Sequence, residues 1–492
     1  MALGVGLTGL SRLPAAFATP VSRPSLLSRD EPLGDARGLL ATPLTLAPRS
    51  VRRFTLVGLH WQGPGTVEFR VRALDGSWSS WQRAVTHELP DPGIEGVANT
   101  RWKLGTPVWT GSSNAIQYRL DGRIERLRGH FVRSETLPIR QTAGTSRPSI
   151  IRRDGWSADE SIVRGEPIYA DRLIGAFVHH TAGSPPATPE ESAAILRAIQ
   201  VYHVKSNGWK DIGYNFLVDT FGQVFEGRAG GIQRNVVGAH ALGFNTGSVG
   251  VAVLGNFEQD DVPAEAFTAL DDLLAWRLDV GHVDPLSTVG FVSGGSVSSL
   301  RAISGHRDVN STACPGEKLY EQLDAIALQV SGIGLPKLYE PSVRSEEEAP
   351  ILFRARLSEP LAWTVTVTDA ADARVAAGSG RGVLVEWAWD ASQVPGGRYR
   401  YAIEAPGVRA ATGLVQIGSV SEPPEPPPPP PARPSGLPRR IPRWAWELRA
   451  WRLKPKAERG PRPSSAPKRL PAWFWPWFAW QQALAEWKEK YG

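Results

Sequence analysis

The stretch "SVGVAVLG", residues 248–255, is apolar at nearly every position, and it constrains the fold more than any other segment. A strand that alternates apolar and polar residues can leave one face in water, whereas a continuous apolar run must be covered on both faces. Helix-like segments lie on either side of it in the sequence, at 187–208, 263–279 and 316–330. Strands that alternate with helices indicate a layered α/β domain.

The first helix-like segment carries explicit start and stop signals. Thr188 is placed as the N-cap, Pro189 takes the first helical position, and Glu191 completes a capping box. Gly208 is expected to end the segment. A single apolar face is predicted, made of Ile195, Leu196, Ile199 and Tyr202. The runs "YNFLVD" and "GQVFEG" that follow are typical of a hairpin.

Length and strand-like segments predict further domains on both sides of the α/β domain. A chain of 492 residues is too long for one hydrophobic core. Residues 50–135 and 350–417 hold runs rich in Val, Phe and Trp between Gly and Pro turns, which are typical of β-sandwiches. The expected segments are a degenerate export signal or disordered start at 1–30, a β-sandwich accessory domain at 31–136, the α/β domain at 150–333, an Ig-like β-sandwich at 345–418, a Pro-rich linker at 421–437 and a basic Trp-rich tail at 438–492.

Positive charge is concentrated in this tail. Residues 438–492 hold 13 Lys/Arg and four Asp/Glu, a net charge of +9, while the whole chain carries +6. The remaining body is therefore slightly acidic, which argues against nucleic-acid binding by the core domains. Eight of the 19 Trp lie among the basic residues of the tail. Interleaved Trp and Arg suit a membrane surface or an anionic wall polymer. The alternative is that the rings pack against protein with Arg stacked over them.

The histidines and the single cysteine suggest a metal site. In "SGHRDVNSTACPG", His306 follows an apolar strand-like run, and Cys314 lies eight residues later in a loop. A catalytic zinc site needs three protein ligands and one open position. The run "AFVHHTAGS" adds His179 and His180 at another strand end, and neighbouring side chains of a strand point to opposite faces. One of the two can therefore complete a His, His, Cys set, although each motif alone is equally typical of a turn, a strand end or a buried cysteine.

Together these motifs resemble the peptidoglycan recognition protein family of zinc amidases. The resemblance runs through "FVHHTAG", "GWKDIGYNFLVDTFGQVFEGR", "VVGAHALGFNTGSVGVAVLGNF" and "SGHRDVNSTACPG", in family order, over about 150–333. It implies a mixed sheet flanked by helices and the activity of an N-acetylmuramoyl-L-alanine amidase, which cuts the amide between the lactyl group and L-alanine of peptidoglycan. It also implies a Zn²⁺ cofactor, peptidoglycan as partner, and a secreted or cell-envelope protein. The segment 31–136 is similar to the accessory domain that precedes such amidases in actinobacterial secreted proteins.

The resemblance also implies roles for individual residues. The site residues that it implies are the zinc ligands His179, His306 and Cys314, the catalytic residues Tyr214 and Thr312, and the substrate contacts Thr181, His203, Arg228, His240 and Asn245. Thr312 is too weak an acid and base for proton transfer, so a hydrogen-bonding role is expected for it. His180 is left for packing or hydrogen bonding on the other face of its strand. Arg228 is placed either on a stem-peptide carboxylate or in a solvated turn.

Some questions stay open in the sequence. "GRAGGIQRN" stands where many relatives carry "GRGW", so a preference for diaminopimelate or lysine in the stem peptide is not assigned. No carboxylate is obviously placed as a general base. A peptidoglycan-binding envelope protein without activity, and a structural zinc protein, are the alternatives to an enzyme. Relatives that bind without cutting commonly lack the cysteine ligand, so Cys314 favours the enzyme.

Overall fold

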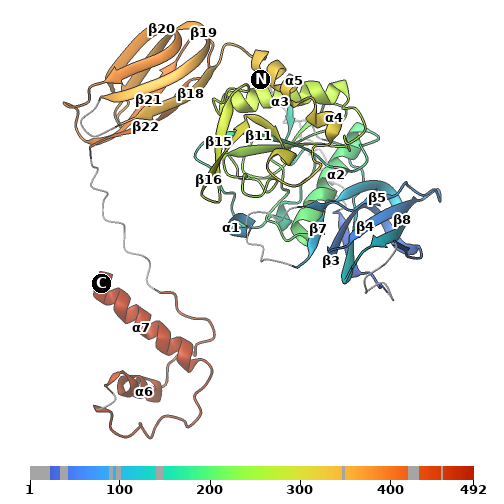
Figure 1. Ribbon diagram of the computed structural model, residues 1–492. Helices are drawn as coiled ribbons and strands as arrows, with labels where there is room; N and C mark the ends of the chain where they lie inside the picture. The colour runs from blue at the N-terminus through green and yellow to red at the C-terminus, as the bar shows by residue number, and fades with distance from the viewer. Residues whose placement is uncertain are drawn as a thin grey trace, which may run out of the picture. The chain divides into compact units, whose positions relative to one another are not determined.

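The structure is a computed structural model that describes residues 23–33, 43–87, 92–95, 101–139, 148–345, 350–418, 431–455 and 458–491. Most of the expected export signal and the first part of the expected Pro-rich linker lie outside the described residues. The chain divides into two compact units, Met1–Ile417 and Gly418–Gly492, which are described separately (Figure 1).

The central domain is built on a six-stranded sheet, as predicted for a mixed α/β domain. Its strand order is β10-β13-β12-β14-β11-β17, and all neighbours are parallel except the hairpin β12–β13. All six residues of β14 are buried, as its apolar run requires. The strands are β10 (Ile150–Ile151), β11 (Gly175–His180), β12 (Phe216–Val218), β13 (Val224–Glu226), β14 (Ser248–Val253) and β17 (Ile303–Gly305); a separate hairpin joins β15 (Thr288–Ser293) to β16 (Ser296–Arg301).

Helices cover both faces of this sheet. Helices α3 (Ala264–Val280) and α5 (Leu323–Gly332) share one apolar cluster with Val178 and Val251 of the sheet. Helix α2 (Pro189–Val201) shares another cluster with Leu217. The prediction of one helix over 316–330 is wrong: the chain forms α4 (Glu317–Tyr320), turns, and continues as α5. In that turn the Gln322 N–H bonds to the carbonyl of Leu319, three residues back, which ends the regular α-helical pattern.

Helix α2 begins as predicted but is buried on more than the predicted face. The hydroxyl of Thr188 accepts a hydrogen bond from the Glu191 N–H, and the Glu191 carboxylate accepts one from the Ala187 N–H at 2.6 Å. Every residue from 192 to 201 is buried, including Arg197, whose guanidinium donates to two backbone carbonyls. Burial lowers the pKa of Arg197 to about 10. A second layer of protein must therefore cover the side of α2 that faces away from the central sheet.

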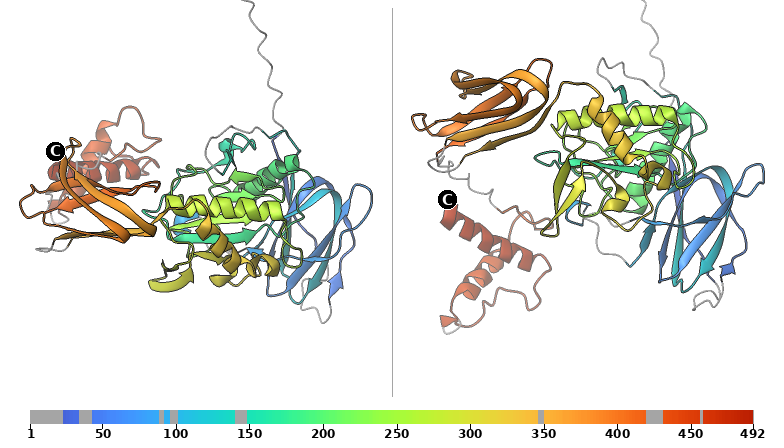
Figure 2. Two further views of the ribbon diagram at one scale, coloured as in Figure 1. Left: turned by 90° about the horizontal axis from the view of Figure 1, so that it is seen from above. Right: turned by 45° about the horizontal axis from the view of Figure 1, so that its top comes forward.

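The N-terminal domain supplies that layer. Its main sheet has the strand order β1-β9-β3-β8-β4-β5, with β2, β6 and β7 attached to it. Leu56, Trp109 and Val132 of this sheet share the apolar cluster of α2, and Figures 1 and 2 show the blue strands against the central domain. The elements are β1 (Ser25–Asp30), β2 (Leu44–Thr45), β3 (Arg49–Gln62), β4 (Thr66–Ala73), β5 (Gln82–Arg83), β6 (Thr86–His87), α1 (Pro92–Glu95), β7 (Lys103–Gly105), β8 (Val108–Asp121) and β9 (Arg126–Arg133).

The contact between these two domains is tight enough to require glycine. A Cβ atom on Gly58 would lie 2.0 Å from the ring of Tyr202, and one on Gly183 would lie 2.7 Å from the backbone nitrogen of Trp109. The Tyr202 hydroxyl donates to the carbonyl of Gly105 at 2.6 Å and lies 3.1 Å from Nε2 of His60. The two domains therefore share a close-packed, hydrogen-bonded interface.

Two histidines at this interface predict that acid destabilises the protein. Nε2 of His130 lies 3.1 Å from Nδ1 of His60. The other ring nitrogen of each histidine is also hydrogen-bonded, that of His60 to Asn207 and that of His130 to Ser28. The pKa of His60 is lowered to about 4 and that of His130 to about 3; burial is the main cause for both, and the charge of Arg128 contributes to both. Since the unfolded chain binds protons on these residues below about pH 6.5 and the folded chain does not, stability is present above that pH and falls as pH drops towards 4.

The slope should reach up to about 1.4 kcal/mol per pH unit for each histidine. Urea unfolding between pH 7 and 4 measures it, and His60→Gln should flatten the slope. A slope that is unchanged in His60→Gln would contradict this assignment.

The C-terminal strands of the first unit form one five-stranded hydrogen-bonded sheet around a single apolar core. The first half of β19 pairs with β18, its second half with β21, and β20 follows it along both halves. The register shifts between Arg356 and Leu361, where the two halves of β19 meet. The strands are β18 (Leu338–Arg344), β19 (Ile351–Thr368), β20 (Arg374–Trp389), β21 (Gly397–Glu404) and β22 (Ala411–Ile417).

The tail forms a small helical unit with an aromatic core. Helices α6 (Arg443–Leu453) and α7 (Phe474–Tyr491) enclose Phe474 and Trp477, both fully buried. Two Trp side chains are largely exposed, Trp446 at 43% and Trp475 at 49%. The aromatic residues therefore serve first to hold the tail together, and binding of an anionic surface by residues 438–492 stays a prediction. Among the described residues, no helix combines the length and the apolar character that crossing a membrane would need.

Candidate metal centre

Three side chains with metal-ligating atoms meet at the carboxyl end of two neighbouring strands. His179 lies near the end of β11, and His306 follows β17, which pairs with β11 in parallel. Cys314 reaches the same point from the loop after His306. The ligating atoms of the three residues all lie within 4.8 Å of one another, and the sulfur of Cys314 is 3.7 Å from Nδ1 of His179. The structure thus brings together the three residues that the sequence suggested.

The outer nitrogens of both histidines are held by further residues. Nε2 of His179 lies 3.2 Å from Nδ1 of His240, and Nε2 of His306 lies 3.1 Å from the side-chain oxygen of Asn310. The side-chain oxygen of Asn245 accepts from the backbone N–H of His240 at 2.8 Å. Metal-ligating histidines are usually fixed in this way by a partner on the far nitrogen. The contacts of His240 and Asn310 with the two histidines therefore fit a metal site, and Asn245 holds the backbone of His240.

The cysteine also fits a metal ligand. Burial raises the pKa of the Cys314 thiol to about 12, and the N–H of His180 points at its sulfur from 3.4 Å. A nearby cation is what would favour the thiolate in such a place. Two imidazoles and one thiolate form a donor set that Zn²⁺ takes in catalytic sites, with a position left for water. These residues would hold a zinc ion.

His180 faces the other side of β11, as the alternation of a strand requires. Its Nδ1 accepts a hydrogen bond from the Phe257 N–H at 3.2 Å. Burial lowers the pKa of His180 to about 4, so the ring is neutral at physiological pH. The second histidine of the pair is thus a buried hydrogen-bond acceptor.

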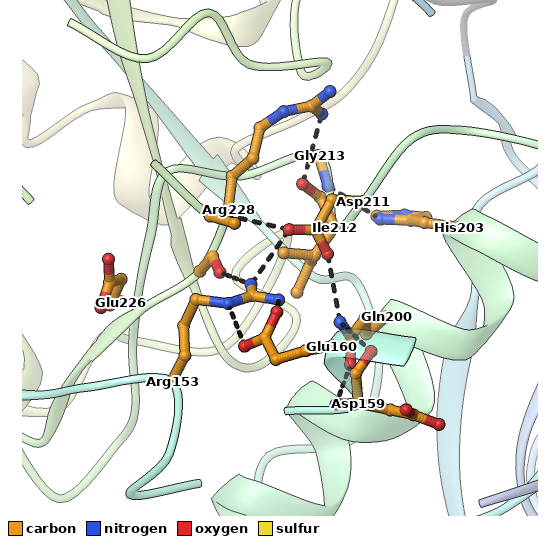
Figure 3. Close-up of polar contacts among 12 residues, drawn as sticks. Arg153, Asp159, Glu160, Gln200, His203, Asp211, Ile212, Gly213, Glu226 and Arg228 are labelled. Carbon is orange, nitrogen blue, oxygen red and sulfur yellow. Dashed lines mark hydrogen bonds and ion pairs between the residues drawn. The ribbon is translucent and has the colours of Figure 1, made fainter. Parts of the chain in front are cut away.

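Tyr214 stands beside the three ligands at the end of a well-supported turn. Its ring centre is 5.3 Å from that of His179. The preceding residues are held by the polar network of Figure 3: Asp211 pairs with Arg153 at 3.0 Å and accepts from Gln200 at 3.1 Å, while the Gly213 N–H donates to His203 at 3.1 Å. Burial raises the pKa of Tyr214 well above its usual value, so the side chain is a neutral O–H donor.

A cleft of about 580 Å³ opens over this cluster. Its floor includes His306, Cys314, Tyr214 and Thr312. Thr312 also accepts a hydrogen bond from the Cys314 N–H at 3.2 Å, which fits the hydrogen-bonding role expected for it. The lining of the cleft also includes residues 182–185, Asn256 and residues 258–260 of the central domain. The N-terminal domain contributes eight lining residues, which lie between Ser80 and Val108. The cleft can therefore hold an extended substrate against a bound metal.

The five expected substrate contacts lie outside the lining of this cleft. His203, His240 and Asn245 take the supporting positions described above. Thr181 is buried and accepts from the Gly255 N–H at 3.1 Å. Arg228 is buried in an ion pair with Glu95 of the N-terminal domain, whose other carboxylate oxygen accepts from the Lys210 N–H at 2.6 Å. A substrate-binding role for these five residues stays a prediction, and in this structure Thr181 and Arg228 are buried with protein partners.

The structure also adds residues that the sequence did not single out. Asn310 could have been found, because it stands four residues after His306 in the same motif. Glu258 and Asp260 bring carboxylates to the cleft, and Trp81 and Arg83 line it from a domain more than a hundred residues away in sequence from Cys314. No local pattern marks these residues, because they become neighbours of the metal centre only through the domain interface.

Comparison with known proteins places these observations in a family. Residues 171–317 match the family described as N-acetylmuramoyl-L-alanine amidase, and residues 15–146 match an N-terminal galactose-binding domain-like family named after Rv3811. The chain is 35% identical to peptidoglycan-recognition protein SC2 of Drosophila melanogaster over 36% of its own length and 84% of the relative. It is 34% identical to peptidoglycan recognition protein 1 of Bos taurus over 35% of its length and 81% of the relative.

One matching solved structure is peptidoglycan recognition protein-LE in complex with tracheal cytotoxin, a monomeric diaminopimelic acid-type peptidoglycan. It is 32% identical, with a TM-score of 0.30, and the match covers 36% of this chain and 92% of that one. The curated relatives are matched over most of their own length. Through its central domain, this chain belongs to the peptidoglycan recognition protein and type 2 amidase family.

Proposed function

We propose that this protein is a zinc-dependent N-acetylmuramoyl-L-alanine amidase that hydrolyses the amide between the lactyl group of muramic acid and L-alanine in peptidoglycan. The observation that carries the proposal is the convergence of His179, His306 and Cys314 beneath a cleft that Tyr214 also lines. Family membership supports peptidoglycan as the ligand. Because peptidoglycan lies outside the cytoplasm, we also propose a secreted or envelope-associated protein.

The residues of the site have different roles in the proposed reaction. A bound Zn²⁺ would supply Lewis acidity for the attack of water on the amide. Tyr214 remains protonated at neutral pH and is placed to donate a hydrogen bond to an oxygen that gains negative charge. Thr312 fixes the loop that carries Cys314, and His240 and Asn310 orient the two histidines. The cleft walls hold the substrate and limit the access of water.

The direct test is hydrolysis of purified cell walls with and without a chelator. We expect new alanine amino termini to be released, to stop when the metal is removed, and to return when zinc is added. Binding to the walls without release of amino termini would favour the alternative, a non-catalytic peptidoglycan-binding envelope protein. The group of metal-ligating residues has three members in the described part of the chain, which suits a catalytic site better than a closed structural one.

Replacing Tyr214 with phenylalanine should separate chemistry from metal binding. The change removes one hydroxyl and leaves all three zinc ligands in place. Loss of a single donor to a developing oxyanion typically lowers turnover by about a hundredfold or more. We expect kcat to fall by roughly that factor while zinc content, measured by atomic emission, stays the same. An unchanged kcat would remove Tyr214 from the mechanism.

A further inference from the structure

The N-terminal domain forms part of the lining of the cleft above the metal centre, and this part is called the N-terminal wall. The residues that it contributes, from β5, β6, β8 and the segments beside them, are Ser80, Trp81, Gln82, Arg83, Val85, Thr86, Thr106 and Val108. The same cleft is lined by His306, Cys314 and Tyr214 of the central domain. A molecule that fills this cleft must therefore touch both domains.

This wall is held in a fixed place relative to the metal centre. The strand that carries His179 runs on into the segment 182–185, which also lines the cleft, and there the Ser184 N–H donates to the carbonyl of Trp109 at 3.1 Å. Gly183 lies so close to Trp109 that no larger residue fits. On the wall itself, the Thr106 N–H donates to the carbonyl of Val85 at 2.8 Å. The wall is thus positioned for substrate by the same contacts that join the domains.

The aromatic centre of the wall is Trp81. The guanidinium of Arg119 lies 4.2 Å from its ring centre, and that of Arg70 lies 4.8 Å away. Arg70 and Arg119 stand on one face of the paired strands β4 and β8, because Glu68 is the direct partner of Arg119. The Trp81 ring therefore lies over this face of the sheet in contact with two guanidinium groups. These cation–π contacts fix the orientation of the ring in the cleft lining.

The other groups on the wall are mostly neutral and able to form hydrogen bonds. Ser80, Gln82, Thr86 and Thr106 offer hydroxyl and amide groups, and among the described residues of the wall Arg83 is the one charged side chain in the cleft lining. The opposite side of the cleft presents Glu258 and Asp260. An aromatic ring with neutral donors and acceptors suits an uncharged sugar, whereas a stem peptide with several carboxylates would call for more cations.

We propose that the N-terminal wall centred on Trp81 is a glycan subsite, which binds the sugar chain of peptidoglycan next to the amide that the metal centre attacks. The inference rests on the proposed function for the position of that amide. It gives the N-terminal domain a direct part in substrate selection: the protein binds a muramoyl peptide more tightly when the muramic acid is part of a longer glycan.

The test compares two substrates in Trp81→Ala and in a matched control. One substrate is a stem peptide on a single N-acetylmuramic acid, and the other is the same peptide on a tetrasaccharide of alternating N-acetylglucosamine and N-acetylmuramic acid. The control is Trp78→Ala, because Trp78 lies in the same segment over Arg70 at 5.0 Å and Arg72 at 5.8 Å but does not line the cleft. We expect Trp81→Ala to raise KM for the tetrasaccharide substrate by about five- to tenfold, the value of one aromatic contact. The kcat, the zinc content and the KM for the single-sugar substrate should stay near those of the wild type, and Trp78→Ala should change neither KM.

Arg83→Ala tests the assignment to sugar rather than to peptide. If Arg83→Ala and Trp81→Ala both raise KM for the two substrates equally, the wall binds the peptide and the glycan assignment is overturned. Equal KM values for the two substrates in the wild type would also overturn it. Calorimetric binding of both substrates to zinc-free protein separates this inference from the proposed function. A preference for the tetrasaccharide substrate that disappears in Trp81→Ala supports the glycan subsite even if the wild type cuts neither substrate.

Discussion

The Cys314→Ser variant will lose its bound zinc and its amidase activity while keeping its fold. Serine preserves the shape of the side chain, but a hydroxyl is much harder to ionise than a thiol and is a poor zinc ligand. Loss of an outer-shell partner of a metal ligand already costs about 10- to 100-fold in affinity or activity. We therefore expect loss of a ligand itself to lower wall hydrolysis by more than about a hundredfold. Zinc content by mass spectrometry, circular dichroism and release of alanine amino termini are the three measurements.

Asn310→Ala is the graded control for this result. It removes the partner on Nε2 of His306 but leaves all three ligands in place. Its zinc affinity should fall by about 10- to 100-fold, and excess zinc should restore activity. Full wall hydrolysis by Cys314→Ser would mean that the metal is held elsewhere or is not needed.

Glu95→Ala will lower the free energy of unfolding by about 3–5 kcal/mol, because it leaves the charge of Arg228 buried without a partner. The side chain of Glu95 is fully buried and that of Arg228 is 6% exposed. Glu95 also accepts from the backbone of Lys210, so the variant leaves that N–H without its carboxylate as well. Urea unfolding monitored by tryptophan fluorescence measures the loss.

A double-mutant cycle isolates the pair from other effects of the change. If Glu95 and Arg228 act together, adding Arg228→Met to Glu95→Ala should recover much of the lost stability. The exposed pair of Asp372 and Arg400, with side chains 75% and 59% exposed, serves as the control. Arg400→Ala should change stability by less than about 1 kcal/mol. Simple additivity of Glu95→Ala and Arg228→Met would contradict the proposed coupling.

The sequence predicted those parts of the structure that depend on local patterns or on a family resemblance. The apolar run of β14, the cap at Thr188 and the hairpin β12–β13 depend on neighbouring residues, and the structure confirms them. The approach of His179, His306 and Cys314 followed from motifs whose order and spacing are characteristic of a family. In both cases the information lies in the spacing of residues along the chain.

What the sequence did not predict depends on contacts between distant segments. The sequence suggested that Arg228 is a substrate contact or a turn residue, because no pattern near it predicts an ion pair with Glu95. The sequence predicted one apolar face for helix α2. In the structure Arg197 and Gln200 are buried as well, so protein covers the helix on several sides. Trp81 looked like one of many strand residues until the domain interface placed it over the metal centre. The ion pair of Arg228 and the place of Trp81 in the cleft lining arise when two separately patterned domains pack, and Glu95 lies more than a hundred residues before Arg228.

The burial of residues 192–201 of α2 on all sides has a consequence for how such proteins can diversify by recombination. A gene fragment that begins at residue 150 encodes the whole amidase-type sheet, yet its product would expose to water the side of α2 that Leu56, Trp109 and Val132 cover here. Exposed apolar surface of that kind favours self-association. A replacement for the N-terminal domain must therefore cover the same side of α2, which ties changes in one domain to changes in the other.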